Sequence, residues 1–415
     1  MAAAVLTIGT ELTRGEIVDT NAAWLSERLT ALGIDVVRMC TVDDDDDRIV
    51  EALRRSSEGA GVVLVTGGLG PTSDDRTAAC AARAAGVACV RDPQSVAAIE
   101  RRLATLGRTP TASVLRQADM PVGAHVLGNP VGTAPAFALA IGGTRFFFMP
   151  GVPGEMTTIF EQLVVPQLGP LASPDSYQLV LRTYGMPESA IGEALADLPS
   201  RFERLTLGYR VSYPEVLVKL HVRMGDLLAS RVAAQAAAAE VEARLGRFVH
   251  GHGEDSLATA VGRALRSRAW SLTVAESCTG GLVGSLLTQV PGSSEYFLFD
   301  AVTYSNGAKE GVLSVPGEVL RTHGAVSAEC ARAMAEGLRR TMPSNMGLAI
   351  TGIAGPGGGT AEKPVGLVYF AVATDHGTAL HRQVFSGERT RIQRGAAFFG
   401  LDLVRRACEI PSPTT

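Results

Sequence analysis

The sequence predicts an α/β protein in which two larger α/β domains flank a small α+β domain. Short apolar runs alternate with amphipathic stretches from residue 1 to about 168, and again from about 255 onward. Such alternation is typical of a parallel sheet covered by helices. Two polar stretches, LGPLASPDS and FVHGHGEDS, interrupt the pattern. We therefore expect domains at 1–170, 171–250 and 251–415, with three layers in each of the two end domains.

Each element of the first domain follows from its residues. AAAVLTIG, IDVVRMC and GVVLVTGG are apolar runs of strand length. Amphipathic segments between or after them predict helices at 21–32, 46–57 and 75–85. APAFALAIGG and TRFFFMPG predict a hairpin that turns at Gly142-Gly143, and a helix follows from Gly154 toward Leu168.

The other two domains are predicted in the same way. The middle domain combines a strand YQLVLRTYG, a helix at 188–197, two strands around Tyr213-Pro214 and an alanine-rich helix. The third domain begins with a helix at 257–267 and continues with the strands WSLTVAES, FLFDAVTYS and MGLAITG, which helices separate. A hairpin, PVGLVYFAVATDHGTALHRQVF, and a final helix at about 390–408 complete it.

Composition disfavours several classes of protein. The net charge of −4 and the pI near 6.0 disfavour a surface for nucleic acid or anionic membrane. Six scattered cysteines without a CxxC pair disfavour a disulfide framework or a zinc ribbon, and fit a reducing compartment. The opening MAAAVLTIG has no basic stretch typical of a signal peptide, and no apolar run is long enough to span a bilayer. We expect a cytoplasmic protein.

TGGLGPTSDD connects an apolar strand of the first domain to a helix. Its glycines, Gly67, Gly68 and Gly70, would let backbone N–H groups approach a bound anion, and the helix start adds positive potential. Asp74 and Asp75 would repel a bare phosphate, so a divalent metal between them is one interpretation. A tight turn whose aspartates cap the helix is the other.

Three more turns follow predicted strands, where α/β proteins place their ligand crevice. They contribute the candidate binding residues Glu11 and Asn21 in GTELTRGEIVDTN, Asn129 in NPVGTAPAF, and Gly151 and Glu155 in MPGVPGEM. The acidic run at 43–47 fits a solvated helix start better than a metal site, because acidic side chains stabilise a helix N-terminus. His250 and His252 fit a polar linker better than metal ligands, because no partner pattern accompanies them.

In the last domain, VAESCTGGLVG places two candidate nucleophiles side by side, Ser277 and Cys278. A cysteine nucleophile needs a histidine partner, and no histidine of this domain lies in a glycine-framed turn, although a helix start could still favour a thiolate. A serine needs a base as well, and DAVTYSNGAKEGVL offers Tyr304 and Lys309. A lysine acts as a base only where burial or nearby positive charge lowers its pKa. The residues alone leave both nucleophiles open, together with a purely structural turn.

Two further segments are candidates for ligand contacts. TGIAGPGGG, which contains Thr351 and Gly352, is a glycine-rich turn after a strand. Arg389, Arg391 and Arg394 open the final helix, where positive charge opposes the helix dipole. A phosphate partner and simple surface solubility would each explain these arginines.

Several motifs in fixed order resemble one family. TGGLGPTSDD, GTELTRG…TN and MPGVPGEM resemble the molybdopterin-binding, MoaB/MogA-like domain that begins CinA proteins, the competence/damage-inducible family. The middle segment resembles the KH-like insert of that family, although the acidic GMPESAIG stands where a KH domain has its basic GxxG loop. AESCTGG, TYSNGAK, TGIAGPGGG, KPVG and the Arg391 region resemble its nicotinamide-nucleotide amidase domain. The resemblance covers essentially the whole chain.

The resemblance implies a bifunctional enzyme of pyridine-nucleotide recycling. The C-terminal domain would hydrolyse nicotinamide mononucleotide to nicotinic acid mononucleotide and ammonia without a cofactor, with Ser277 as nucleophile and Lys309 and Tyr304 activating it. Its substrate contacts would be Thr279, Gly280, Thr351, Gly352 and Arg391. The N-terminal domain would hydrolyse ADP-ribose with a divalent metal near Asp74 or Asp75, and potassium is a further candidate ion. Its substrate contacts would be Glu11, Asn21, Gly67, Gly68, Gly70, Asn129, Gly151 and Glu155.

Two other functions remain alternatives. One is a nucleic-acid-binding accessory protein of competence or DNA damage, which the acidic balance and the missing GxxG loop disfavour. The other is a molybdopterin-binding protein. From the family likeness we also expect a homodimer, with small nucleotides as ligands and no membrane partner.

Overall fold

The computed structural model describes residues 2–169 and 176–409, which form two compact units. The first unit comprises Met1–Tyr177 with Arg223–Arg231, and the second comprises Gln178–Val222 with Val232–Thr415. Most of LGPLASPDS, the break expected near residue 170, lies outside the described residues. Among the helices that are described, none combines the length and the apolar character that crossing a membrane requires.

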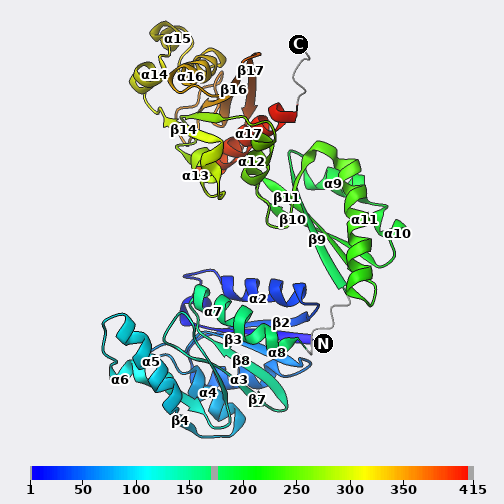
Figure 1. The fold of residues 1–415 in the computed structure, drawn as a ribbon, viewed down its shortest axis with the longest axis vertical. Coiled ribbons are helices and arrows are strands. Elements are labelled where there is room, and N and C mark those ends of the chain that lie inside the picture. Colours follow the sequence, from blue (N-terminus) through cyan, green and yellow to red (C-terminus); the bar gives the residue numbers. More distant parts are fainter. Residues whose placement is uncertain (1, 170–175, 410–415) are drawn as a thin grey trace. The chain divides into compact units, whose positions relative to one another are not determined.

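The first unit is a three-layer α/β domain built on a six-stranded sheet (Figure 1). In the order across the sheet, the strands are β2 (Asp35–Val42), β1 (Ala2–Ile8), β3 (Val62–Thr66), β8 (Thr144–Met149), β7 (Ala136–Ile141) and β6 (His125–Gly128). Strands β2, β1, β3 and β8 run parallel, and the β7–β8 hairpin turns at Gly142 and Gly143, both with positive φ. The expected parallel sheet and hairpin are confirmed.

Helices cover both faces of this sheet (Figure 1). One face carries α2 (Thr20–Ala31), α7 (Pro153–Ile159) and α8 (Val165–Leu168), the last two joined by a π-helical turn at Phe160–Val164. The other carries α3 (Asp46–Ser56) and α4 (Thr77–Ala85). Several elements were not predicted from the sequence: α1 (Thr10–Thr13), β4 (Cys89–Arg91), α5 (Pro93–Thr105), α6 (Ala112–Leu115) and β5 (Asp119–Pro121).

The acidic run at 43–47 begins α3. Asp45 caps the helix by accepting hydrogen bonds from the backbone N–H groups of Asp47 and Arg48, both at 3.1 Å. Asp46 forms an ion pair with Arg76 at 2.6 Å. The interpretation of this run as a helix start is confirmed.

The second unit contains the small α+β segment and the C-terminal α/β segment. The first of these has a four-stranded sheet, β10 (Leu205–Ser212), β11 (Glu215–Arg223), β9 (Ser176–Tyr184) and β12 (Val249–His252), in that order. Its helices are α9 (Glu188–Leu195), α10 (Leu198–Arg201) and α11 (Leu227–Leu245).

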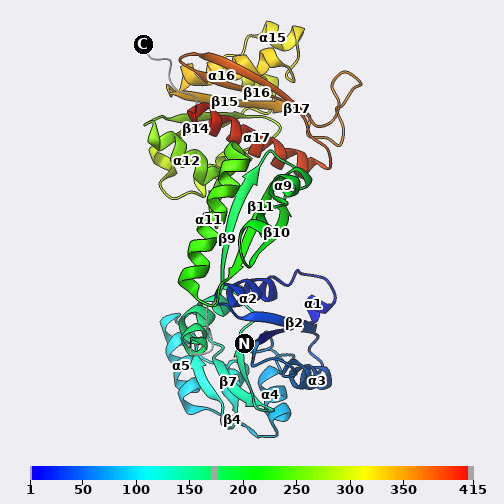
Figure 2. The same ribbon diagram turned by 90° about the vertical axis from the view of Figure 1, so that its right-hand side faces the viewer.

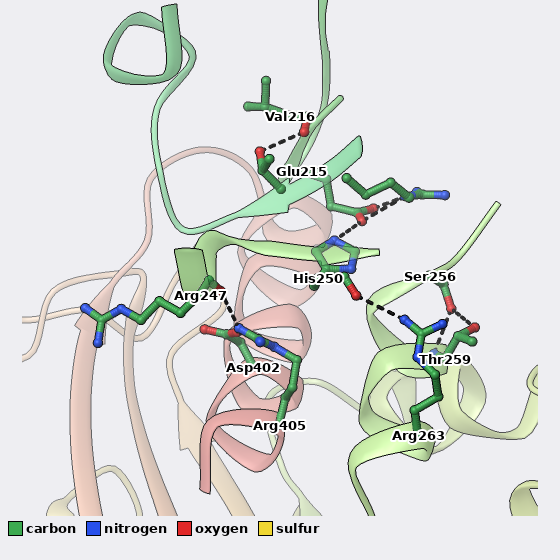
Figure 3. Close-up of polar contacts among 11 residues, drawn as sticks. Glu215, Val216, Arg247, His250, Ser256, Thr259, Arg263, Asp402 and Arg405 are labelled. Atoms are coloured by element: carbon green, nitrogen blue, oxygen red, sulfur yellow. Dashed lines mark hydrogen bonds and ion pairs between the residues drawn. The ribbon is translucent and has the colours of Figure 1, made fainter. Parts of the chain in front are cut away.

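The expectation that His250 and His252 belong to a polar linker is wrong. They lie in β12, which pairs with β9. The His250 side chain is buried, and its Nε2 lies 2.8 Å from Glu215 Oε1 (Figure 3). The same oxygen accepts a hydrogen bond from Arg182 Nε at 3.2 Å. Burial of a paired histidine explains its place in a strand, because a buried polar ring needs a partner.

The C-terminal segment is a second three-layer domain (Figure 2). Its sheet has the order β14 (Phe297–Val302), β13 (Leu272–Glu276), β15 (Met346–Gly352), β16 (Leu367–Thr374) and β17 (Gly377–Val384). One face packs against α12 (Leu257–Ser267), α13 (Leu282–Thr288) and α17 (Arg389–Glu409). The other packs against α14 (Asn306–Leu313), α15 (Gly317–Thr322) and α16 (Ala328–Thr341). The predicted α/β class is confirmed.

The contact of α16 with α14 gives the first prediction. Gly337 lies in α16, where a Cβ would meet the Leu313 carbonyl oxygen at 1.8 Å, whereas a Cβ on Gly311 of α14 would meet nothing within 4 Å. Gly337→Ala should destabilise the second unit by about 1–3 kcal/mol through overpacking. Gly311→Ala should stabilise it by about 0.5–1 kcal/mol, because alanine is the better helix former. Denaturant unfolding followed by circular dichroism measures both; equal effects of the two substitutions would contradict the packing.

Candidate functional site

A pocket in the C-terminal domain lies where three neighbouring strands end. Ser277 follows β13, Thr303 and Tyr304 follow β14, and Thr351 is near the end of β15. The pocket has a volume of about 220 Å³. Its lining residues are Ser277, Cys278, Tyr304, Lys309, Ala325, Val326, Thr351, Gly352, Ala354 and Arg389. Segments far apart in sequence are therefore brought together at one sheet edge.

Lys309 is the buried amine of this pocket. Its side chain is 1% exposed, and its Nζ donates to the carbonyl oxygens of Thr303 at 2.7 Å and Tyr304 at 3.4 Å, and to Ser277 Oγ at 3.1 Å. Burial lowers the pKa of Lys309, although nearby thiols oppose the shift. Among the described residues no carboxylate forms an ion pair with it. The environment thus favours a neutral amine beside the serine hydroxyl.

Cys278 has a different environment. It is 4% exposed and packs in the apolar core of α12, α13 and α17. Burial raises the pKa of its thiol to about 12. Its backbone carbonyl accepts a hydrogen bond from Gln393 Nε2 at 2.9 Å. Cys278 is therefore a buried packing residue, and of the two candidate nucleophiles Ser277 is the one that the Lys309 amine contacts.

The loop after Ser277 is held in a tight turn. Gly280 and Gly281 have φ values of +66° and +94°, in the region that glycine tolerates best. Within the described part of the chain, the backbone N–H groups of Cys278 and Thr279 donate to no protein acceptor. Such free N–H groups beside a nucleophile suit stabilisation of a developing oxyanion. The hydroxyl of Thr351 is already engaged, because it donates to the Ala325 carbonyl at 2.7 Å.

Of the two arginines at the start of α17, Arg389 contacts Tyr304 at the pocket and Arg391 contacts Tyr213 outside it. The exposed hydroxyl of Tyr304 accepts a hydrogen bond from Arg389 at 2.9 Å, and Arg389 also donates to the Gly355 carbonyl at 2.6 Å. Arg391 lies outside the pocket, with its guanidinium 3.6 Å from the centre of the Tyr213 ring. Tyr304 thus reaches Lys309 through its backbone carbonyl, and Arg389 is the arginine that lines the pocket.

Two supporting side chains were not singled out from the sequence. Gln393, one turn after Arg389 on α17, holds the Cys278 carbonyl. Lys363 donates to the carbonyl oxygens of His323 and Val326 at 2.8 Å each, and so fixes the segment that forms one wall of the pocket. Position in KPVG was a signal for Lys363, but nothing in the sequence distinguishes Gln393 from other polar helix residues.

The first unit has a larger pocket, of about 480 Å³, at the ends of β1, β3 and β8. Most residues predicted for this domain line it: Glu11, Asn21, Gly67, Gly68, Gly70, Asp74, Asp75, Gly151 and Glu155. Asn129 lies behind the pocket and donates to Glu155 Oε2 at 2.7 Å. Asn21 donates to the Gly151 carbonyl at 2.8 Å, which joins two of the predicted turns.

The glycine turn of this pocket is required by close packing. A Cβ on Gly67 would lie 2.0 Å from the Ile8 carbonyl oxygen, and φ at Gly67 is +107°. A Cβ on Gly68 would lie 2.2 Å from Thr77 Oγ1. The turn therefore has no room for a side chain at Gly67 or Gly68, and the Gly67 N–H donates to the Met149 carbonyl at 3.1 Å.

The carboxylates of the turn do not form a ready-made metal cage. Asp75 Oδ2 accepts from the Thr72 backbone N–H at 2.8 Å and from its hydroxyl at 2.6 Å, while Asp74 is exposed at the pocket rim. Across the described residues, no three His, Cys, Asp or Glu side chains converge to hold a metal ion. One or two carboxylates beside a phosphorylated ligand nevertheless fit the way Mg²⁺ is commonly bound.

Three protein-family models match successive parts of the chain. The family described as probable molybdopterin binding domain matches residues 4–170, the damage-inducible protein CinA KH domain matches 178–251, and the CinA C-terminal domain matches 254–408. A solved competence/damage inducible protein CihA from Agrobacterium tumefaciens is 39% identical, and the match covers 37% of this chain and 94% of that chain with a TM-score of 0.36.

Curated relatives match over nearly the full length. CinA-like proteins of Desulfosudis oleivorans and Geobacter metallireducens are each 42% identical, over 98% of this chain and 99% of their own. A CinA-like protein of Myxococcus xanthus is 42% identical over 97% of each chain. With three family domains in order and relatives aligned from end to end, this chain belongs to the CinA family.

Proposed function

We propose that the C-terminal domain is a serine amidase that hydrolyses nicotinamide mononucleotide to nicotinic acid mononucleotide and ammonia. The observation that carries the proposal is the 3.1 Å contact between Ser277 Oγ and the buried Lys309 Nζ. The substrate itself rests on the family resemblance of the surrounding motifs. An amide is a reasonable target for this pair, because a serine with a neutral amine base can form and release an acyl intermediate.

The hydrogen bonds of Lys309 suit a general base. A neutral amine has two N–H groups and one lone pair. In the neutral amine, the carbonyl oxygens of Thr303 and Tyr304 would accept the two N–H groups. The contact in which Nζ donates to Ser277 Oγ would then reverse, so that the lone pair faces the Ser277 hydroxyl proton. After protonation, the same amine would be a charged donor held by two carbonyls, ready to return its proton.

The reaction would then proceed in two halves. Ser277 Oγ attacks the carboxamide carbon while Lys309 takes the hydroxyl proton, and the N–H groups of Cys278 and Thr279 stabilise the oxyanion. The C–N bond breaks, and Lys309 gives its proton to the departing nitrogen, which leaves as ammonia. Water then attacks the acyl-serine, Lys309 takes a proton from that water, and the proton returns to Ser277 Oγ as the acid is released.

Ammonia release from nicotinamide mononucleotide should distinguish the two candidate nucleophiles. Ser277→Ala and Lys309→Ala should each lower kcat by about 10³-fold or more, whereas Cys278→Ala should keep activity within about tenfold. In the wild type, activity should rise with pH as Lys309 loses its proton, with a midpoint below the ordinary lysine value of 10.5, because burial lowers the pKa of this amine. Full activity of Ser277→Ala would refute the assignment of the nucleophile.

The arginines of α17 provide a matched pair for the substrate phosphate. Arg389 lines the pocket, and we assign it to the phosphate; Arg391 stacks on Tyr213 instead. Arg389→Ala should raise KM by about tenfold or more, because a charged hydrogen bond is lost, and should affect a substrate without the phosphate far less. Arg391→Ala serves as the control. A larger KM effect at Arg391 than at Arg389 would return the phosphate role to Arg391.

For the first unit, we infer hydrolysis of ADP-ribose to AMP and ribose 5-phosphate. The supporting observation is the pocket of about 480 Å³ with bare backbone at Gly67 and carboxylates on its rim. Asp74 and Asp75 would hold a divalent ion against the diphosphate, where the ion would neutralise charge on the phosphate oxygens. Gly68 and Gly70 would bring backbone N–H groups to the same oxygens, whereas the Gly67 N–H already donates to the Met149 carbonyl at 3.1 Å.

ADP-ribose turnover with added Mg²⁺ or other divalent ions tests this second reaction. Asp75→Asn should lower turnover at least about tenfold, and a chelator should abolish it, because the diphosphate charge would be uncompensated. Asp47→Asn, which alters a carboxylate paired with Arg83 away from the pocket, is the control. Turnover that survives both chelator and Asp75→Asn would refute the metal proposal, and pterin that copurifies with the protein would instead favour a molybdopterin-binding role.

A further inference from the structure

Two carboxyl side chains lie behind the loop that carries Ser277. Glu276, the last residue of β13, is 0% exposed. Asp300 is on the neighbouring parallel strand β14 and is largely withdrawn from solvent, with Oδ1 buried and without a hydrogen-bond partner among the described residues. Buried carboxyl groups are costly unless they are paired, so their presence next to the pocket calls for a physical explanation.

Glu276 holds the backbone of the turn. Its Oε2 accepts the Gly281 N–H and its Oε1 accepts the Gly284 N–H, both at 3.0 Å. These N–H groups belong to the end of the Ser277 loop and the first turn of α13. A single side chain therefore fixes the far end of the segment whose near end carries the nucleophile.

Asp300 supports Glu276 from the other strand. It packs so closely on α13 that a Cβ on Gly284 would lie 2.2 Å from Asp300 Oδ2. Burial raises the pKa of Asp300 to about 8, and the adjacent Glu276 carboxylate contributes to the shift. Both carboxyl groups therefore lie against the same residue, because Glu276 Oε1 accepts the Gly284 N–H and Asp300 Oδ2 faces the Gly284 Cα. Two ionised carboxylates held this close inside a protein repel each other, so a shared proton is the stable arrangement. In this hydrogen bond Asp300 is the donor and Glu276 the acceptor, because both oxygens of Glu276 already accept backbone N–H groups.

We propose that a protonated Asp300 donates a hydrogen bond to Glu276, and that this carboxyl pair positions the loop bearing Ser277 and the free N–H groups of Cys278 and Thr279. Both are positioning residues, since neither lines the pocket. The proposal rests on the amidase function proposed above. Among the described residues, Glu276 is the charged group that raises the pKa of Asp300. The positive charges of Lys309 and Arg389 act instead on the pKa of Cys278.

Three variants test the pair by steady-state ammonia release. Asp300→Asn keeps a neutral donor of the same shape, so kcat should stay within about threefold of the wild type. Asp300→Ala and Glu276→Gln remove the donor or the second acceptor, and kcat should fall about 10- to 100-fold with KM nearly unchanged, as expected for a misplaced catalytic loop. Thr273 lies on the same strand as Glu276, and Thr273→Val removes its hydrogen bond to Ser344. This variant controls for general destabilisation and should leave kcat unchanged.

The pH dependence provides a readout that a merely structural role would not change. In the wild type, Asp300 loses its proton above about pH 8, so kcat should fall there as the two carboxylates repel. Asp300→Asn should abolish that alkaline fall and keep the rise that Lys309 controls. Unchanged kcat in Asp300→Ala, or an alkaline fall that persists in Asp300→Asn, would overturn the proposal.

Thermal unfolding separates this proposal from the amidase function. Between the ordinary aspartate pKa and about 8, the folded wild type binds a proton that the unfolded chain releases, so its stability falls as pH rises. The Tm advantage of Asp300→Asn over the wild type should therefore grow from mildly acidic to alkaline pH; parallel curves would refute the shared proton. If the wild type releases no ammonia, the amidase proposal fails, and the rate at which a fluorophosphonate labels Ser277 in the same variants still tests the positioning role.

Discussion

The buried amine of Lys309, which has no carboxylate partner in the described part of the chain, constrains how the strands around the C-terminal pocket end. Lys309 reaches the pocket because α14 begins at Asn306, and the Ser305 hydroxyl caps it by accepting the Ala308 N–H at 3.1 Å. The amine must then find acceptors, and the carbonyl oxygens at the end of β14 are within reach only if that strand ends beside β13. The order of the strands thus brings Ser277, the carbonyls and the amine to one point.

Burial selects between serine and cysteine in the same loop. Burial lowers the pKa of Lys309 and raises the pKa of Cys278, because each charged form is disfavoured away from water. Burial thus disfavours the ammonium form of Lys309 and the thiolate form of Cys278, and it is the amine that contacts Ser277 Oγ. Environment, rather than the intrinsic nucleophilicity of sulfur, therefore favours the oxygen nucleophile.

The elements that depend on hydrophobic periodicity and on turn residues could be predicted from the sequence. The side-chain positions that depend on tertiary packing could not. The sheets and the glycine turns could be anticipated from apolar runs and turn residues. The contact of Ser277 with Lys309 was expected only from the family resemblance, because the residues alone left Ser277, Cys278 and a structural turn open. The choice between Arg389 and Arg391 could not be predicted, because it depends on which side of α17 meets the pocket and which meets Tyr213. His250 was misjudged for the same reason: its partner Glu215 is distant in sequence and becomes a neighbour only through strand pairing.

The packing of α17 shows that the boundary between two family models is not a boundary of the folded structure. The boundary between the two family models falls between residues 251 and 254, yet α17 packs against residues that precede this boundary. Phe398 lies 6.3 Å from the Tyr184 ring, and the nearly buried Arg405 donates to the Arg247 carbonyl at 2.8 Å (Figure 3). A fragment cut at the family boundary would expose an aromatic ring and strip a buried guanidinium of an acceptor. The C-terminal domain and the KH-like segment thus match separate family models but share one folded surface.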